Sequence, residues 1–312
     1  MSDECDILVV GGGLAAMSAA LTSARLGRST SILTGGVPGG ELLSIEKIEG
    51  VPGFPDGIPG YDLCPITQEQ ADAVGVQFLS ATGDAIVANG DRWRVTSAEG
   101  DIDARAVIIA TGTAIAKLDV PGEERLFGKG VSHCASCDGP LLRNRIAVVV
   151  GGGDSAMQEA LTLADHLSRV VLLERGDALT GQETYRERIL SNPRIEPHFG
   201  KVVTEIVGDD GVTHVRVRDV ASGSESEIET AAVFAFPGLV PNSDLVRDLL
   251  PLDETGRIRV DPALRTPARG ICAAGNVRQG SPHRAAAAMG DGAAAAVAAD
   301  LYLATGEWPL PS

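Results

Sequence analysis

Two cysteines, Cys134 and Cys137, lie two residues apart in the stretch CASCDG, and Asp138 follows them directly. Cysteines at this spacing serve three kinds of site. They form half of a zinc site, a buried structural pair, or a dithiol that cycles with its own disulfide. The rest of the chain bears on the choice among these three.

The zinc interpretation lacks ligands. Zinc takes four protein ligands, or three and a water, but the chain has no second Cys-x-x-C and no histidines at ligand spacing near Cys134. A buried structural pair stays open, although cysteines at this spacing readily form a redox-competent disulfide. The remaining cysteines, at 5, 64 and 272, are isolated and do not make a secreted disulfide framework.

Composition indicates a two-domain protein that does not bind nucleic acid or membrane. The 312 residues are too many for one minimal core. The 42 acidic against 26 basic side chains give a formal net charge of −16, which suits neither nucleic acid nor an anionic membrane. No apolar run approaches the roughly 18 residues of a membrane helix, and no basic, apolar leader opens the chain. We therefore expect a cytoplasmic location.

A dinucleotide-binding loop opens the chain. The apolar run DILVV leads into Gly11, Gly13 and Ala16, which give G-x-G-x-x-A ahead of a helix-like segment. In this pattern the first glycine permits a tight turn, the second lets the backbone approach a pyrophosphate, and the small third residue lets helix pack on strand. The helix N-terminus then offers free amides to the phosphates.

The same pattern returns in the middle of the chain. RIAVVV leads into Gly151, Gly153 and Ala156, and the next strand ends at Glu174. An acid about 20 residues beyond the glycines often binds a ribose hydroxyl. Each loop could also be only a tight strand-to-helix turn, so the alternatives are two bound dinucleotides, or one dinucleotide and a relic.

Each half continues through a β-meander to a buried strand and a glycine. The first meander covers about 85–112 and the second about 201–238, and an alanine-rich helix starts near Arg284 and completes the first domain. The sequence therefore predicts an α/β fold. It consists of two Rossmann-like dinucleotide-binding domains, each with a parallel sheet plus a β-meander in three layers, the second inserted into the first.

The order of these motifs resembles the low-molecular-weight, bacterial-type thioredoxin reductases over nearly the whole chain. The dithiol between two glycine loops is the specific part, and supporting stretches are GVPGGELLSIEKIEGVPGF, GVSHCASCDG and GLVPNSDL. The resemblance implies an FAD-binding domain at 1–116 and 244–312, a pyridine-nucleotide-binding domain at 117–243, and a homodimer.

The resemblance also implies roles for the dithiol. Electrons would pass from NADPH to FAD, to the dithiol and then to a disulfide such as that of thioredoxin. Cys137 would lie nearer the flavin, Cys134 would attack the substrate, and Asp138 would handle protons. We add the hypothesis that a charged His133 favours a Cys134 thiolate.

The loops and the resemblance together give two sets of expected binding residues. For FAD these are Gly11, Gly13, Ala16, Gly40, Glu41, Thr111, Gly112, Gly275, Asn276, His283, Arg284 and Ala285. For a nicotinamide dinucleotide they are Gly151, Gly153, Ala156, Glu174 and Arg175.

The sequence departs from the family at both cofactor sites. The family's basic cluster for the 2′-phosphate of NADPH is reduced to Arg175, and Glu174 suits a free ribose diol instead. NADPH is therefore disfavoured, and NADH, a ferredoxin, a flavin carrier or substrate thiols are the alternative donors. On the flavin side Glu41, Asn276 and His283 replace the family's usual Gln, Asp and Arg, which predicts an altered flavin potential or reactivity.

Three functions compete at this stage. The first is a flavin-dependent disulfide reductase of thioredoxin-reductase type. The second is a dithiol oxidase that forms a disulfide in a small molecule and passes electrons to oxygen. The third is a non-catalytic flavin-binding redox sensor, against which the complete C-x-x-C-D argues, because a sensor needs no adjacent acid.

Overall fold

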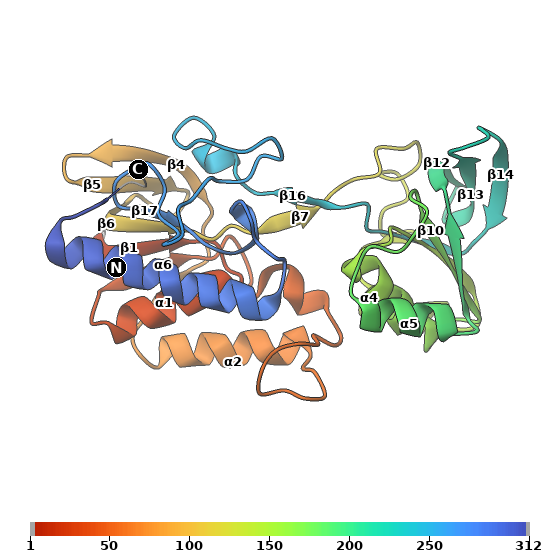
Figure 1. Cartoon of the computed structure of the whole chain (residues 1–312), viewed down its shortest axis with the longest axis horizontal. Helices are drawn as coiled ribbons and strands as arrows, with labels where there is room; N and C mark the ends of the chain where they lie inside the picture. The colour runs from red at the N-terminus through yellow and green to blue at the C-terminus, as the bar shows by residue number, and fades with distance from the viewer. Residues whose placement is uncertain (1–3, 310–312) are drawn as a thin grey trace. The chain divides into compact units, whose positions relative to one another are not determined.

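The computed structural model describes residues 4–309, and the chain divides into two compact units. Unit 1 comprises the residues up to Ala114 and from Val240 onward, and unit 2 comprises Ile115–Leu239. The chain passes between the units twice, in strands β7 (Thr113–Ile115) and β16 (Leu239–Pro241), which pair with each other (Figure 1). The second unit is thus inserted into the first.

Unit 1 is built on a sheet of order β3-β2-β1-β6-β5-β4, with β17 pairing β6 on a second path. Strands β1, β2, β3, β6 and β17 run parallel, and β4, β5 and β6 form an antiparallel meander. The strands are β1 (Glu4–Val10), β2 (Thr30–Leu33), β3 (Gln77–Leu79), β4 (Gly83–Asn89), β5 (Arg92–Ser97), β6 (Ile102–Ile109) and β17 (Ile271–Ala273).

The two faces of this sheet bury different layers. Ile7 and Val9 of β1 pack with the helices, whereas Leu8 and Val10 pack with the meander and with the segment near Val246. Side chains that alternate between two buried faces explain why β1 is apolar throughout. The helices, which lie together beside the sheet in Figure 1, are α1 (Leu14–Arg25), α2 (Gly60–Asp72) and α6 (Ala285–Thr305), with short 3-10 turns η1 (Gly40–Ser44), η3 (Asp244–Val246) and η4 (Gly275–Val277).

Helix α6 confirms the expected alanine-rich element. It begins directly after Arg284 and ends at Thr305, and Gly306 caps it, because the left-handed backbone of Gly306 (φ 73°) lets its N–H bond to the Tyr302 carbonyl. Its contact with α1 requires a glycine, because a Cβ at Gly292 would lie 2.1 Å from the Ala15 carbonyl oxygen. Neither α6 nor any other helix within residues 4–309 is long and apolar enough to span a membrane.

Unit 2 repeats the three layers. Its parallel sheet has the order β11-β10-β9-β15-β8, and a separate antiparallel sheet has the order β12-β13-β14. Val149 and Leu172 face the helices, and Val148 and Val171 face the antiparallel sheet. The elements are β8 (Val131–Ser132), α3 (Ala135–Asp138), η2 (Gly139–Leu142), β9 (Ile146–Val150), α4 (Asp154–Ala164), β10 (Arg169–Glu174), α5 (Glu183–Ser191), β11 (Ile195–Phe199), β12 (Lys201–Gly208), β13 (Val212–Asp219), β14 (Glu225–Glu229) and β15 (Ala232–Ala235).

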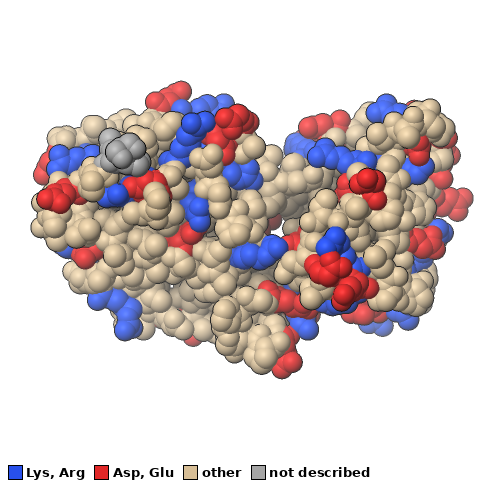
Figure 2. Space-filling view, viewed as in Figure 1, with Lys and Arg blue, Asp and Glu red and all other residues tan. Residues whose placement is uncertain are grey.

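The predicted fold class is confirmed: the chain has two Rossmann-like domains, each in three layers, and the second is inserted into the first. One difference separates the meanders. In unit 1 the meander shares β6 with the parallel sheet, whereas in unit 2 it is a sheet of its own. Figure 2 shows acidic and basic side chains interspersed over the face in view, without a broad basic patch.

Candidate functional site

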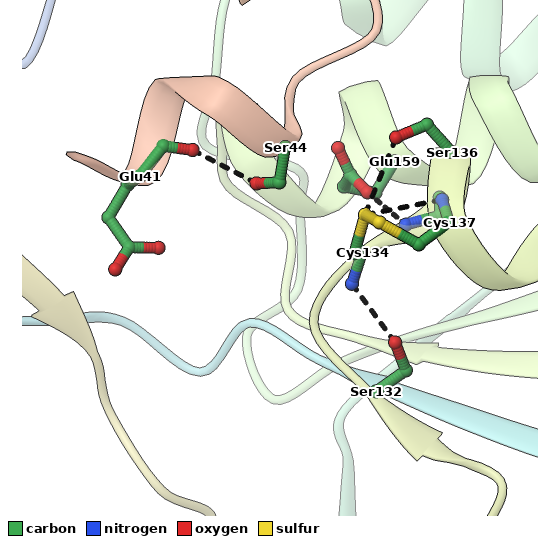
Figure 3. The surroundings of a disulfide bond; sticks show 8 residues. Glu41, Ser44, Ser132, Cys134, Ser136, Cys137 and Glu159 are labelled. Atoms are coloured by element: carbon green, nitrogen blue, oxygen red, sulfur yellow. Dashed lines mark hydrogen bonds between the residues drawn. A yellow bond between two sulfur atoms is a disulfide. The ribbon is translucent and has the colours of Figure 1, made fainter. Parts of the chain in front are cut away.

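The dithiol stretch folds as a single helical turn. Cys134 is the N-cap of α3, its N–H donates to Ser132 Oγ (3.1 Å), and its carbonyl oxygen accepts from the Asp138 N–H (3.2 Å). One turn of helix brings residues three apart onto the same side, and Cys134 and Cys137 form a disulfide there (Figure 3). Within residues 4–309 no group of three or more His, Cys, Asp or Glu side chains that could hold a metal ion is found.

The two sulfurs have different surroundings. Cys134 Sγ accepts the Cys137 N–H (3.2 Å) and lies 3.4 Å from Ser136 Oγ, and Cys134 is half-buried whereas Cys137 is exposed. Hydrogen-bond donors stabilise a thiolate. In the reduced pair the Cys137 N–H would stabilise a thiolate at Cys134.

Glu159 of α4 is a site residue that sequence reasoning missed. Its side chain is only 2% exposed, and its Oε2 accepts the N–H of Ala135 (2.6 Å), the first residue of α3 (Figure 3). The readable signal was a charge within the buried stripe of an amphipathic helix, between Ala156 and Leu163. Ser132 and Ser136 were missed as well, because their bonds to Cys134 depend on the turn conformation.

His133 lies between the rings of Phe127 and Phe236, at centroid distances of 5.5 and 6.3 Å. Burial lowers the pKa of His133 below its ordinary value, and the Glu123 carboxylate opposes this only in part. Its Nε2 is buried and has no hydrogen-bond partner among the residues that the structure describes. A neutral imidazole at pH 7 gives a Cys134 thiolate no charge, which argues against the role hypothesised from the sequence.

Unit 1 holds a cavity of about 700 Å³ at the carboxyl ends of its parallel strands. Parallel α/β sheets bind ligands at this edge. Eight of the residues expected to bind FAD line the cavity: Gly11, Gly13, Gly40, Glu41, Thr111, Gly112, Gly275 and Asn276. Four others do not line it: Ala16 is fully buried in α1, and His283, Arg284 and Ala285 stand at the start of α6 outside the lining.

The glycine loop of this cavity fits a pyrophosphate. Gly11 has φ 125°, and a Cβ there would lie 2.2 Å from the Ala110 carbonyl oxygen, so the turn requires glycine. A Cβ at Gly13 would meet no atom within 4 Å, so this position leaves the backbone open to a ligand. The first turn of α1 carries no acidic residue, which leaves its free amides to an anion. The residues present therefore fit the diphosphate of FAD.

The far wall of the cavity joins two distant stretches of sequence. Thr111 Oγ1 donates to the Asn242 carbonyl (2.6 Å), and Asn242 Nδ2 donates to the Thr111 carbonyl (2.9 Å). Asn242 and Thr34 line the cavity but were not expected from the sequence. The side chain of Asn276 accepts a hydrogen bond from Ser281 Oγ (3.0 Å).

Two of the substituted flavin-side residues have shifted pKa values. Burial raises the pKa of the Glu41 carboxyl, which lines the cavity. His283 has an unusual backbone for a residue with a side chain (φ 54°), and burial, then Arg257 and Arg284, lower its pKa. At neutral pH His283 is therefore uncharged, unlike the arginine that the family resemblance implies there.

The second glycine loop lies in unit 2, and the Glu174 carboxylate lies against it. Gly151 (φ 122°) makes the same tight turn as Gly11, and a Cβ at Gly153 would meet nothing within 4 Å. Glu174, at the end of β10, is 9% exposed, and its Oε1 accepts the Gly176 N–H (2.7 Å). Its other oxygen, Oε2, would lie 2.4 Å from a Cβ at Gly152. The carboxylate is thus fixed above the loop, while Arg175 is exposed.

Comparison with known proteins places these features in a family. Residues 5–292 match the model of the family described as pyridine nucleotide-disulphide oxidoreductase. The chain is 37% identical to the thioredoxin reductase of Treponema pallidum over 98% of this chain and 99% of that protein. It also resembles the crystal structure of Lactococcus lactis thioredoxin reductase, with a TM-score of 0.93, 36% identity, and 96% and 99% of the two chains covered. For the T. acidophilum thioredoxin reductase the TM-score is 0.92 at 33% identity, with 98% and 100% covered.

Proposed function

Because the chain belongs to the pyridine nucleotide-disulphide oxidoreductase family, we propose that it carries electrons from a reduced pyridine nucleotide through FAD and the Cys134–Cys137 dithiol to a protein disulfide such as that of thioredoxin. The resemblance to thioredoxin reductases noted from the sequence is confirmed, and the chain is a flavoprotein disulfide oxidoreductase of that type. The observation that carries the proposal is the disulfide on α3, whose Cys134 sulfur accepts the Cys137 N–H.

FAD, when bound, supplies the two-electron carrier between nicotinamide and dithiol. The residues of this chain that would hold it are the glycine loop at Gly11–Gly13 and the wall at Ala110–Thr113, with Gly275 and Asn276. Their part is to bind the diphosphate on the amides of α1 and to orient the rest of the molecule by hydrogen bonds.

The dithiol step is a pair of exchanges at sulfur. The Cys134 thiolate attacks one sulfur of the substrate disulfide, forms a mixed disulfide and expels the other sulfur as a thiolate. The Cys137 thiolate then attacks Cys134 Sγ, which restores the Cys134–Cys137 disulfide and releases the second substrate thiolate. Two electrons pass to the substrate, whose two thiolates take up protons. Asp138, at the end of the same turn, is the residue we assign to proton transfer with the thiols.

For the electron donor we propose NADH rather than NADPH. The buried Glu174 carboxylate, fixed by the Gly176 N–H above Gly152, is an acceptor for the two hydroxyls of an adenosine ribose. A 2′-phosphate at that position would meet a carboxylate instead of the basic cluster that binds it in the family, and only Arg175 remains of that cluster.

An anaerobic stopped-flow measurement of flavin bleaching tests the donor. We expect NADH to reduce the flavin with a kcat/KM at least tenfold above that for NADPH. Equal or faster reduction by NADPH would remove the proposal for NADH. Bleaching by reduced ferredoxin or by a reduced flavin carrier, with neither nucleotide active, would assign the donor to one of those carriers.

A thioredoxin-coupled assay tests the function itself. We expect the protein with NADH to reduce thioredoxin disulfide, and Cys134→Ser and Cys137→Ser each to abolish this while FAD stays bound. The reduction of the family's basic cluster to Arg175 alone also fits the reverse reaction, in which a small dithiol is oxidised and oxygen accepts the electrons. Peroxide formed from a dithiol without nucleotide, and no thioredoxin reduction, would replace our proposal with that oxidase. The homodimer stays a prediction from the family resemblance.

A further inference from the structure

We propose that Asp291 is a positioning residue for FAD, whose carboxylate reaches from the middle of α6, clamps both ends of the turn η4 and so sets Asn276 in the wall of the cofactor cavity. The inference deepens the proposed function and rests on it, since it assumes that the cavity of unit 1 holds FAD. Asp291 is not among the residues that line this cavity, so it acts through Asn276, which is.

The clamp consists of three hydrogen bonds to one carboxylate. Asp291 Oδ2 accepts the Gly275 N–H (3.0 Å) and the Nε–H of Arg278 (2.6 Å), and Oδ1 accepts from Nη2 of the same arginine (2.8 Å). The arginine side chain is 15% exposed and that of the aspartate 12%, so this forked, charge-assisted pair is weakly screened by water. Gly275 is the first residue of η4, and Arg278 follows its last. One side chain of α6 therefore holds both ends of the turn.

The first peptide of the turn requires such a partner. Gly275 is buried and has a left-handed backbone (φ 76°), and a Cβ there would lie 2.8 Å from the Ala15 Cβ of α1. A buried N–H that bonds neither to protein nor to water costs free energy. Because Asp291 accepts this N–H, the peptide is satisfied in the one orientation that the close approach to α1 allows.

Asn276 lies between the two clamped ends and lines the cavity. Its Oδ1 accepts a hydrogen bond from Ser281 Oγ (3.0 Å), and the same hydroxyl oxygen accepts the His283 N–H (3.4 Å). The Asn276 Nδ2 hydrogens are then available to an acceptor in the cavity. FAD has such acceptors in its ribityl hydroxyls and ring carbonyls, so a fixed Asn276 offers the cofactor a donor in a fixed place.

The sequence of α6 supports a role for Asp291 beyond helix formation. The residue stands between Gly290 and Gly292 in a helix that is otherwise rich in alanine, and aspartate and glycine are both poor helix formers. Gly292 is explained by its contact with α1, because a Cβ there would lie 2.1 Å from the Ala15 carbonyl oxygen. The acid at 291 is explained by its bonds to η4. A local choice that opposes the helix is typical of a functional constraint.

Dilution of the FAD-loaded full chain measures the effect. The protein is diluted in steps, and the fluorescence of released FAD gives its Kd. We expect Asp291→Ala and Asn276→Ala each to raise this Kd about tenfold, the factor for one lost hydrogen bond to a charged or well-placed group. The double variant should bind FAD about as Asp291→Ala does, because an Asn276 that is no longer held contributes little. Two independent losses would instead multiply to about 100-fold.

Asp300→Ala is the matched control. Asp300 lies further along α6 and accepts from Arg28 Nε (2.6 Å), and it is not among the residues that line the cavity. Both alanine variants should lower the melting temperature, but only Asp291→Ala should change the Kd of FAD. Asp291→Asn keeps an oxygen for the Gly275 N–H and loses the charge that pairs with Arg278. It should raise the Kd by less than Asp291→Ala does, and it carries the test if the alanine variant does not fold.

Two results would overturn this inference alone. One is a wild-type Kd of FAD in the folded Asp291 variants, which would leave the clamp a purely structural feature. The other is a pair of losses at 291 and 276 that multiply in the double variant, because Asp291 would then not act through Asn276. A wild-type chain that binds no FAD would instead overturn the proposed function, and this inference with it.

Discussion

Replacing Glu174 by alanine should change which nucleotide reduces the flavin. In the structure its Oε1 accepts the Gly176 N–H at 2.7 Å, and the carboxylate lies above Gly152 where an adenosine ribose would approach. Hydrogen bonds to a charged group contribute about 1.5–3 kcal/mol each. Losing one of them should weaken NADH binding by about 10- to 100-fold, since 1.4 kcal/mol is a factor of ten.

The same change removes a negative charge from the site that would receive a 2′-phosphate. The kcat/KM for NADPH should therefore stay the same or rise slightly. The ratio of kcat/KM for NADH to that for NADPH should fall by about one to two orders of magnitude. Glu174→Gln, which keeps an acceptor oxygen without the charge, should lie between wild type and Glu174→Ala. Folding stability should change little, because Gly176 is exposed and its N–H can bond to water.

Anaerobic stopped-flow reduction with each nucleotide measures both values, and thermal unfolding checks the fold. The same ratio of kcat/KM for NADH to that for NADPH in wild type, Glu174→Gln and Glu174→Ala would refute the reasoning. So would a variant that loses both nucleotides equally, because that result describes a damaged loop and not a lost ribose contact.

Three further outcomes follow from backbone glycines and from the half-buried His133. Gly11→Ala should lower the free energy of unfolding by more than about 2 kcal/mol, because its Cβ would lie 2.2 Å from the Ala110 carbonyl oxygen and the residue would keep φ 125°. Gly13→Ala should fold normally, because its Cβ would meet no protein atom, but it should bind FAD weakly. Thermal unfolding and the absorbance of bound flavin measure the two effects. Gly292→Ala should destabilise the α1–α6 contact, whereas Gly290→Ala, with no atom within 4 Å, should stabilise the helix by about 0.5–1 kcal/mol. Burial lowers the pKa of folded His133 below its unfolded value, so folding stability should fall as pH drops through the unfolded value near 6.5, and His133→Phe should lose part of that slope.

Each of these outcomes has a clear contrary. Full FAD occupancy in Gly13→Ala would mean that the diphosphate does not approach that position. Equal melting temperatures for Gly292→Ala and Gly290→Ala would mean that α6 can shift away from α1 without loss. An unchanged pH slope in His133→Phe would mean that the imidazole titrates normally in the folded protein.

Much of the fold was readable because its signals are local. The apolar strands before Gly11 and Gly151 and the amphipathic helices after them follow from residue periodicity and glycine geometry, and both appear where expected. The separate sheet formed by β12, β13 and β14 was not readable, because strand pairing across a meander depends on long-range packing.

The site was readable only in part for the same reason. The two cysteines and the cavity's glycines stand at motif spacing, whereas Asn242 reaches Thr111 through a return crossing that no local pattern encodes. Glu159 carries a signal, a charge in an apolar stripe, but its partner Ala135 becomes visible only once α3 and α4 pack together. The hypothesis of a charged His133 was made without knowledge of its two aromatic neighbours, Phe127 and Phe236, which sequence spacing does not reveal.

The central claim is that the Cys134–Cys137 disulfide receives the electrons that enter through the flavin. Anaerobic titration of the FAD-loaded protein with NADH, followed by alkylation and mass analysis of both cysteines, tests it most directly. The account predicts that two two-electron equivalents yield a bleached flavin with both thiols alkylated, and that thioredoxin disulfide then reoxidises them. A fully bleached flavin beside an intact Cys134–Cys137 disulfide would contradict it.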